Sequence, residues 1–94
     1  MDFRQWRRTL RNKLGATEDR EGDHIYYYLF IGESDHRVGK ASHSARSSET
    51  VQDYVIADTA RRLKLNKSEF LQLVDCSIDR DDHARLWYER DPSY

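Results

Sequence analysis

The stretch that decides the fold runs from Ile25 to Ile31 and reads Ile-Tyr-Tyr-Tyr-Leu-Phe-Ile. Its β-branched and aromatic residues fit the pleated surface of a sheet, so we predict a strand here. Successive side chains of a strand point to opposite faces. One face is therefore expected to carry Ile25, Tyr27, Leu29 and Ile31. The other face is expected to carry His24, Tyr26, Tyr28 and Phe30.

The segments beside this strand predict a small antiparallel sheet. Residues 32–35, Gly-Glu-Ser-Asp, have the composition of a turn. Residues 37–43 would then return as the second strand of a hairpin. Residues 17–23 precede the central strand and are a candidate for a third strand. The sheet is therefore expected to contain two or three strands.

Helices are expected before and after the sheet. Residues 3–14 repeat apolar side chains at spacings of three and four, which is a helical period. The apolar stripe consists of Phe3, Trp6, Leu10 and Leu14, and a set of arginines lies about 100° or more around the axis, namely Arg4, Arg8 and Arg11. Later helices are expected over residues 50–64, over 66–74 and from residue 79. Their starts are marked by the capping patterns Thr50/Asp53, Asn66/Glu69 and Asp79/Asp82.

These elements define an α+β fold in which helices pack on one face of a small antiparallel sheet. The chain has 94 residues, which is the length of one domain. We expect a single domain over residues 1–94, with a core over about residues 3–75. Residues 76–94 are expected to form an acidic helical extension of that core.

Composition excludes several classes of protein. No run approaches the roughly 18 apolar residues of a membrane span, so no membrane partner is expected. The first residues lack the apolar region of a secretory signal. The only cysteine, Cys76, excludes an intramolecular disulfide framework and favours a reducing cytoplasm. Because Cys76 follows an apolar segment, we expect its small side chain to be buried.

The formal net charge of -1 hides an asymmetry between the two ends of the chain. Residues 1–14 carry five basic side chains against Asp2 alone, whereas residues 75–94 carry six acidic and three basic side chains. The basic end could contact a phosphate backbone, and the acidic end would be repelled by it or held by a basic partner. The alternative is that both ends are solvated helix faces.

Neither a metal site nor a cofactor site is expected. The histidines at positions 24, 36, 43 and 83 lack the spacing of a metal-binding pair. The four glycines are scattered and form no phosphate-binding loop. His36 in the hairpin turn and His83 in the acidic helix are expected to be exposed polar residues.

Four segments between about Leu14 and Cys76 together resemble a known family. They are residues 22–26 (Gly-Asp-His-Ile-Tyr), 40–44 (Lys-Ala-Ser-His-Ser), 60–65 (Ala-Arg-Arg-Leu-Lys-Leu) and 70–76 (Phe-Leu-Gln-Leu-Val-Asp-Cys). In pattern and order they are similar to the HicA-type mRNA interferase toxins, particularly the longer members. The resemblance covers about two thirds of the chain.

The resemblance implies a fold like that of a double-stranded-RNA-binding domain. It also implies cleavage of messenger RNA without a metal, by one histidine in a Gly-x-His sequence at the start of a strand. His24, within Gly22-Asp23-His24, stands at that position. A HicB-type antitoxin protein that covers the site is the implied partner.

The residues themselves supply chemistry for such a reaction. A histidine near its ordinary pKa of about 6.5 can act as general base or general acid at neutral pH, so His24 is the catalytic candidate. Extra charge on phosphorus requires a cation. The candidate RNA contacts are Lys40, the arginines Arg4, Arg8 and Arg11, the stacking residues Tyr26 and Tyr28, and His43. His43 could equally be a loop histidine that is hydrogen-bonded to the backbone.

Two further functions remain open on the sequence. The same sheet and the arginine-bearing helix could bind structured RNA without cleaving it. Alternatively, the tyrosine face or the acidic tail could dock a protein partner. The sequence leaves the oligomeric state open.

Overall fold

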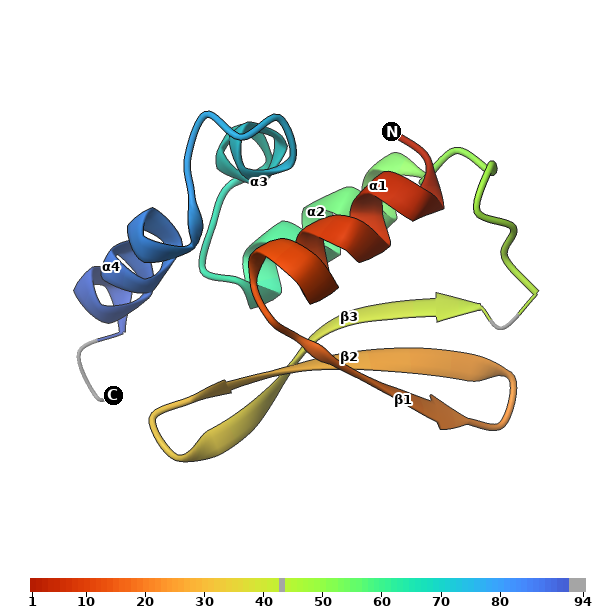
Figure 1. Cartoon of the computed structure of the whole chain (residues 1–94), viewed down its shortest axis with the longest axis horizontal. Helices are drawn as coiled ribbons and strands as arrows, with labels where there is room; N and C mark the ends of the chain where they lie inside the picture. Colours follow the sequence, from red (N-terminus) through yellow and green to blue (C-terminus); the bar gives the residue numbers. More distant parts are fainter. Residues whose placement is uncertain (43, 92–94) are drawn as a thin grey trace.

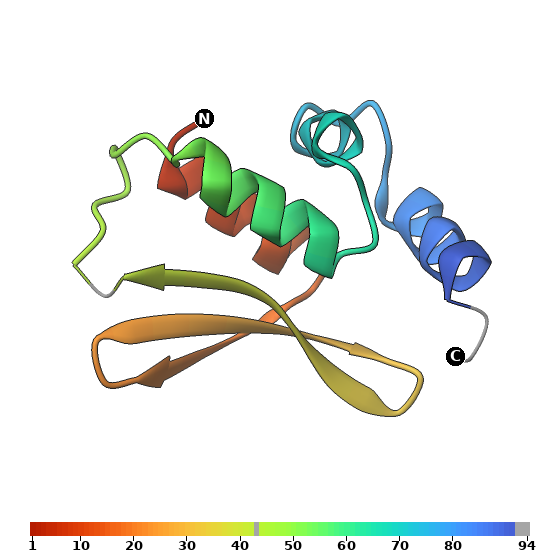
Figure 2. The same ribbon diagram turned by 180° about the vertical axis from the view of Figure 1, so that it is seen from behind.

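The computed structural model describes residues 1–42 and 44–91, so the predicted contact His43 lies outside the described residues. The elements are α1 (Phe3–Arg8), the π-helical turn η1 (Thr9–Lys13), β1 (Thr17–Glu21), β2 (His24–Ile31), β3 (Ser34–Ser42), α2 (Asp53–Arg62), α3 (Lys67–Val74) and α4 (Arg80–Arg90). The strands form one antiparallel sheet in the order β1-β2-β3. Helices α1 and α2 lie side by side over one face of this sheet, as Figure 1 and Figure 2 show from opposite sides. The α+β prediction is confirmed, and the topology is consistent with the arrangement expected from the resemblance.

The central strand β2 is built as its alternation predicts. Ile25, Tyr27 and Leu29 are buried against the helices. The candidate third strand exists as β1, which pairs with β2 from Thr17 opposite Tyr28 to Glu21 opposite His24. The alternation of β2 therefore divides the sheet into an inner face against the helices and an outer face.

The β2–β3 turn is tighter than predicted, because β3 already begins at Ser34. The two residues between the strands, Gly32 and Glu33, have φ angles of 61° and 67°. Two residues with positive φ form the hairpin turn whose twist matches that of the flanking strands. The predicted four-residue turn was therefore too long by two residues.

The core is centred on Trp6, which is fully buried. Its ring lies edge-on to that of Tyr27, with 5.1 Å between centroids. Its Nε1 donates a hydrogen bond of 3.1 Å to the Thr59 hydroxyl of α2. The predicted apolar stripe of the first helix is confirmed, since Phe3, Leu10 and Leu14 are buried as well.

The close approach of α1 to the sheet depends on Gly39 of β3. A Cβ atom at Gly39 would lie 2.8 Å from Leu10 Cδ1 and 3.0 Å from Trp6 Cζ2. The pairing of β2 with β3 shifts at this point: Tyr27 is opposite Gly39, and Tyr28 is opposite Arg37. Val38 is therefore the extra residue of a β-bulge, and both Val38 and Gly39 are buried.

Two of the three predicted capping boxes are present. Asn66 and Asp79 each accept a hydrogen bond from the backbone N–H three residues later, and Glu69 and Asp82 reach back reciprocally. The box at Thr50 is wrong, because α2 begins at Asp53 and its N-cap residue makes no side-chain cap. Thr50 pairs instead with Asp2 in an isolated β-bridge, since the N-terminal residues are hydrogen-bonded to the loop before α2.

The C-terminal segment corrects two further predictions. His83 is buried, with 2% of its surface exposed, because α4 folds back onto the end of α2 and places the ring 3.0 Å from the Leu63 carbonyl. Cys76 is exposed rather than buried, because it follows the last turn of α3. The Nζ atom of Lys13 lies 2.8 Å from the Sγ atom of Cys76 and donates hydrogen bonds to the carbonyls of Leu73 and Val74. Lys13 thereby stabilises the negative end of α3.

Within residues 1–42 and 44–91, no helix has both the length and the apolar character that crossing a bilayer requires.

Replacing Gly39 by alanine is expected to destabilise the protein. The added methyl would push Trp6 and Leu10 out of a packed core, which costs about 1–3 kcal/mol. Urea unfolding followed by circular dichroism measures the free energy of unfolding. The exposed neighbour Lys40, changed to alanine, is the control and is expected to change that free energy by less than about 0.5 kcal/mol. Equal stability of Gly39→Ala and wild type would contradict the close approach.

Acidification is expected to weaken the attachment of α4. Burial lowers the pKa of His83 below its ordinary value of 6.5, and the hydrogen bond to Leu63 offsets this only in part. The unfolded chain then binds more protons than the folded chain, so stability is lost as the pH falls below about 6.5. Urea unfolding at pH 7.5 and at pH 5.5 should show this loss, and His83→Gln should reduce it. An unchanged loss in His83→Gln would contradict the assignment.

Candidate functional site

A groove of about 390 Å³ lies at the end of the sheet where β2 begins and β3 ends. The sheet contributes His24, Lys40 and Ser42 to its lining, and the loop and first turn that lead into α2 contribute Glu49 and Tyr54. The groove therefore combines an imidazole, an ammonium group, a carboxylate and hydroxyls. These are the groups that proton transfer and anion binding require.

The register of β2 and β3 brings three predicted site residues together: His24, Tyr26 and Lys40. His24 is paired with Ser42, and Tyr26 is paired with Lys40. Because paired residues of antiparallel strands project to the same face, all four side chains belong to the outer face or its end. His24 is half-buried, and its ring lies 6.2 Å from that of Tyr26 at an angle of 40°.

Two cations flank the ring of Tyr26. The guanidinium carbon of Arg37 lies 5.3 Å from the ring centroid, and Nζ of Lys40 lies 6.0 Å from it. Both distances are within the range of a cation–π contact. Arg37 is a functional candidate that the sequence did not single out. It reaches the outer face because the bulge at Val38 shifts the pairing of β3 by one residue.

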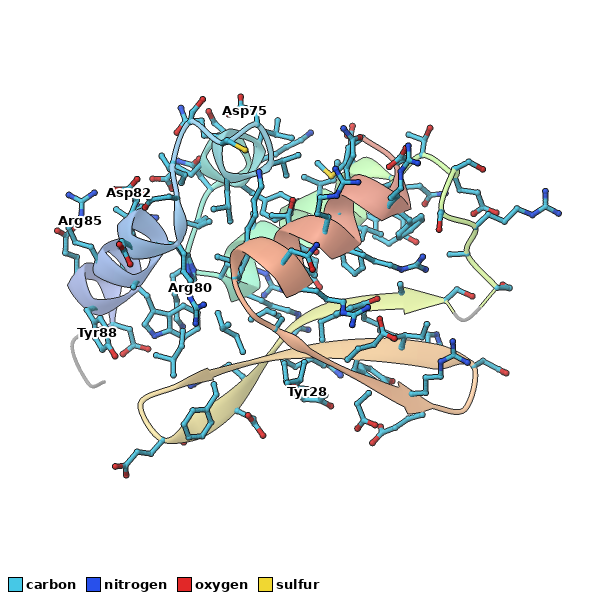
Figure 3. The ribbon with its side chains drawn as sticks, viewed as in Figure 1. Tyr28, Asp75, Arg80, Asp82, Arg85 and Tyr88 are labelled. Atoms are coloured by element: carbon cyan, nitrogen blue, oxygen red, sulfur yellow. The ribbon has the colours of Figure 1, made fainter. Side chains whose placement is uncertain are left out.

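Tyr28 also belongs to the outer face. Figure 3 shows its side chain projecting from the side of β2 that faces away from α1 and α2. It is half-buried and pairs with Thr17 on β1 and with Arg37 on β3. The predicted stacking residues Tyr26 and Tyr28 therefore share one surface with Lys40.

The three predicted arginines lie elsewhere. Arg4, Arg8 and Arg11 are exposed on α1 and η1, which cover the inner face of the sheet, and none of them lines the groove. Arg11 contacts Glu18 at 3.7 Å. Together with Arg7 it borders a separate hollow of about 330 Å³ at the β1 side of the sheet. The structure thus does not bring this basic patch together with His24.

Tyr54 is the groove residue that sequence reasoning missed. Its side chain is 71% exposed at the start of α2, next to the groove. The available signal was its place outside the apolar face of the predicted helix, where an aromatic residue has no packing role. Glu49 gave no such signal, because only the path of the loop brings it to the groove.

The acidic C-terminal segment pairs several of its charges, within α4 and with residues before α4. Arg85 lies 3.4 Å from Asp82, Arg90 lies 2.7 Å from Glu69, and Lys64 lies 3.6 Å from Asp91. The Arg90 guanidinium holds the pKa of Glu69 at about 2. Asp82 and Arg85 lie on the side of α4 away from the sheet in Figure 3. Part of the charge of this segment is therefore paired within the chain.

Apart from position 43 and the last three residues, which are not described, no group of three His, Cys, Asp or Glu side chains is placed to hold a metal ion.

Comparison with protein-family models, with curated proteins and with solved structures finds no match to this chain. The site is therefore interpreted from its own geometry and chemistry.

Proposed function

We propose that this chain is a HicA-like, RNA-directed toxin of a toxin–antitoxin system, a metal-independent endoribonuclease that acts on messenger RNA in the cytoplasm. The observation that carries the proposal is the shared groove of His24 and Lys40, which opens beside the ring of Tyr26. A proton-transfer group, a phosphate-binding cation and a stacking surface thus lie at one end of the sheet.

The reaction requires one proton to leave and one to arrive. His24, as general base, would take the proton of a ribose 2′-hydroxyl, whose oxygen attacks the adjacent phosphorus. The bond from phosphorus to the 5′-oxygen then breaks, which leaves a 2′,3′-cyclic phosphate, and the leaving oxygen must receive a proton. His24 could instead serve as that acid. Glu49 also lines the groove and is a second group that could transfer a proton there.

Lys40 and Tyr26 would position the substrate. The ammonium of Lys40 is exposed in the groove and would stabilise the extra negative charge on phosphorus. The ring of Tyr26 would stack on a neighbouring base, a contact worth about 1–3 kcal/mol. A HicB-like antitoxin, implied by the resemblance, would inhibit the protein by covering this groove.

A non-catalytic RNA-binding module is the second candidate. Two carboxylates close to His24 favour this alternative. Asp23 precedes His24 in the sequence, and Glu21 is paired with His24 across β1 and β2. Negative charge at this point repels a phosphate and opposes formation of a 2′-oxyanion. Under this alternative the same surface binds RNA, and the binding weakens with salt.

Cleavage is expected to depend on His24 and to persist in EDTA. Labelled RNA is incubated with wild-type protein and with His24→Ala, and the products are separated on a denaturing gel. Loss of one general acid–base group should lower the rate about 10²- to 10⁴-fold. His36→Gln is the matched control, because His36 lies outside the groove and contacts Trp87. Equal cleavage by wild type and by a folded His24→Ala protein would contradict the nuclease proposal.

Binding is expected to depend on Tyr54. A base that enters the groove would stack on this exposed ring, so Tyr54→Ala should weaken binding about 5- to 150-fold. Fluorescence anisotropy with 2′-O-methyl RNA, which cannot be cleaved through its 2′-oxygen, measures the affinity. Tyr88→Ala is the control, because this ring is also exposed but lies on α4. Equal loss in both variants would place the RNA outside the groove.

A further inference from the structure

The outer face of the sheet carries a row of rings along β2. The row consists of His24, Tyr26, Tyr28 and Phe30, and Phe30 is 68% exposed. The helices that cover the sheet lie on its other side in both Figure 1 and Figure 2. This row begins at the groove of His24 and ends at the β2–β3 hairpin.

The two sides of this row carry opposite charges. On the β1 side, Asp19 is paired with Tyr26 and Glu21 is paired with His24. On the β3 side, Lys40 is paired with Tyr26 and Arg37 is paired with Tyr28. In the described part of the chain, none of these four charged groups is within ion-pair distance of an opposite charge. At the hairpin end Asp35 is paired with Phe30, so the basic edge of β3 extends only from Arg37 to Lys40. From His24 to Tyr28, the outer face is therefore a row of rings between a basic edge and an acidic edge.

We propose that this face binds single-stranded RNA in one orientation, with phosphates along β3 and base edges toward β1. Asp19 and Glu21 would then favour bases that carry an amino group, namely adenine, cytosine and guanine, over uracil. This inference rests on the proposed function and names the substrate class of the same site.

The spacing of the rings requires a single strand. Side chains two residues apart on one face of a strand are separated by about 6.8 Å. Stacked nucleotides rise only about 3.4 Å along one strand. Successive bases can therefore lie on successive rings only when the strand is extended and its bases are unstacked. Such bases stack on aromatic side chains and on guanidinium planes.

The charges decide the orientation of the strand. Arg37 and Lys40 attract the phosphates, while Asp19 and Glu21 would repel them. The base edges consequently meet the carboxylates, which accept hydrogen bonds but donate none when ionised. Cytosine and adenine each present an exocyclic amino donor to such an acceptor. Uracil presents carbonyl oxygens at these positions and keeps only its N3–H as a donor, so the carboxylates favour it less.

The test compares uniform octanucleotides of adenosine, cytidine and uridine, all 2′-O-methylated to block cleavage. Fluorescence anisotropy with the full chain should show adenosine and cytidine octamers binding about fivefold or more tightly than the uridine octamer. Asp19→Asn should reduce this preference to within about twofold, because an amide both donates and accepts. Glu89→Gln removes the same charge from α4 and should preserve the preference. Arg37→Gln should lower the slope of log affinity against log salt by about 0.7.

The outcomes separate this inference from the nuclease proposal. Equal affinity of the three octamers, or a preference that Asp19→Asn leaves unchanged, would show that the carboxylates of β1 do not discriminate between bases. Either result overturns the inference even if RNA is cleaved. A preference lost in Asp19→Asn supports the inference even if wild-type protein cleaves no RNA. Absence of binding to every octamer at low salt overturns the inference, and the cleavage assay then decides the nuclease proposal independently.

Discussion

The indole of Trp6 is the contact on which the rest of the structure depends. It packs edge-on against Tyr27 of β2, lies over the backbone of Gly39 on β3, and donates a hydrogen bond to Thr59 on α2. One side chain thus fixes the first helix, the sheet and the second helix relative to one another. A tryptophan suits this position because it combines a large apolar surface with one polar group that needs a partner.

Fixing the helices on one face leaves the opposite face of the sheet uncovered by helices. Alternation along β2 sends Tyr27 into the core and Tyr26 to the outer face, so one strand supplies both. The bulge at Val38 then decides which cations join Tyr26. Without the extra residue, Arg37 would be paired with Leu29 and would project toward the helices. A local irregularity in β3 therefore places the second cation of the outer face.

The candidate site was only partly predictable, for reasons that differ between its residues. His24, Tyr26, Tyr28 and Lys40 follow from strand alternation and hairpin pairing, which are local rules. Tyr54 and Glu49 reach the groove through the loop before α2, whose path depends on hydrogen bonds to the N-terminal residues. The sequence assigned Arg4, Arg8 and Arg11 to the same site on the basis of their charge alone. The fold places them on the helical layer over the inner face of the sheet, away from His24.

The sequence by itself determined the face of each β2 residue, the apolar stripe of the first helix and the caps at Asn66 and Asp79. Each of these depends on side chains within a few positions of one another, through a fixed period or a short hydrogen-bonded ring. The tertiary structure alone decided the burial of His83 and the need for glycine at position 39. These features arise where α4 meets α2 and where Trp6 meets β3. The chain must be folded before such partners, distant in sequence, come into contact.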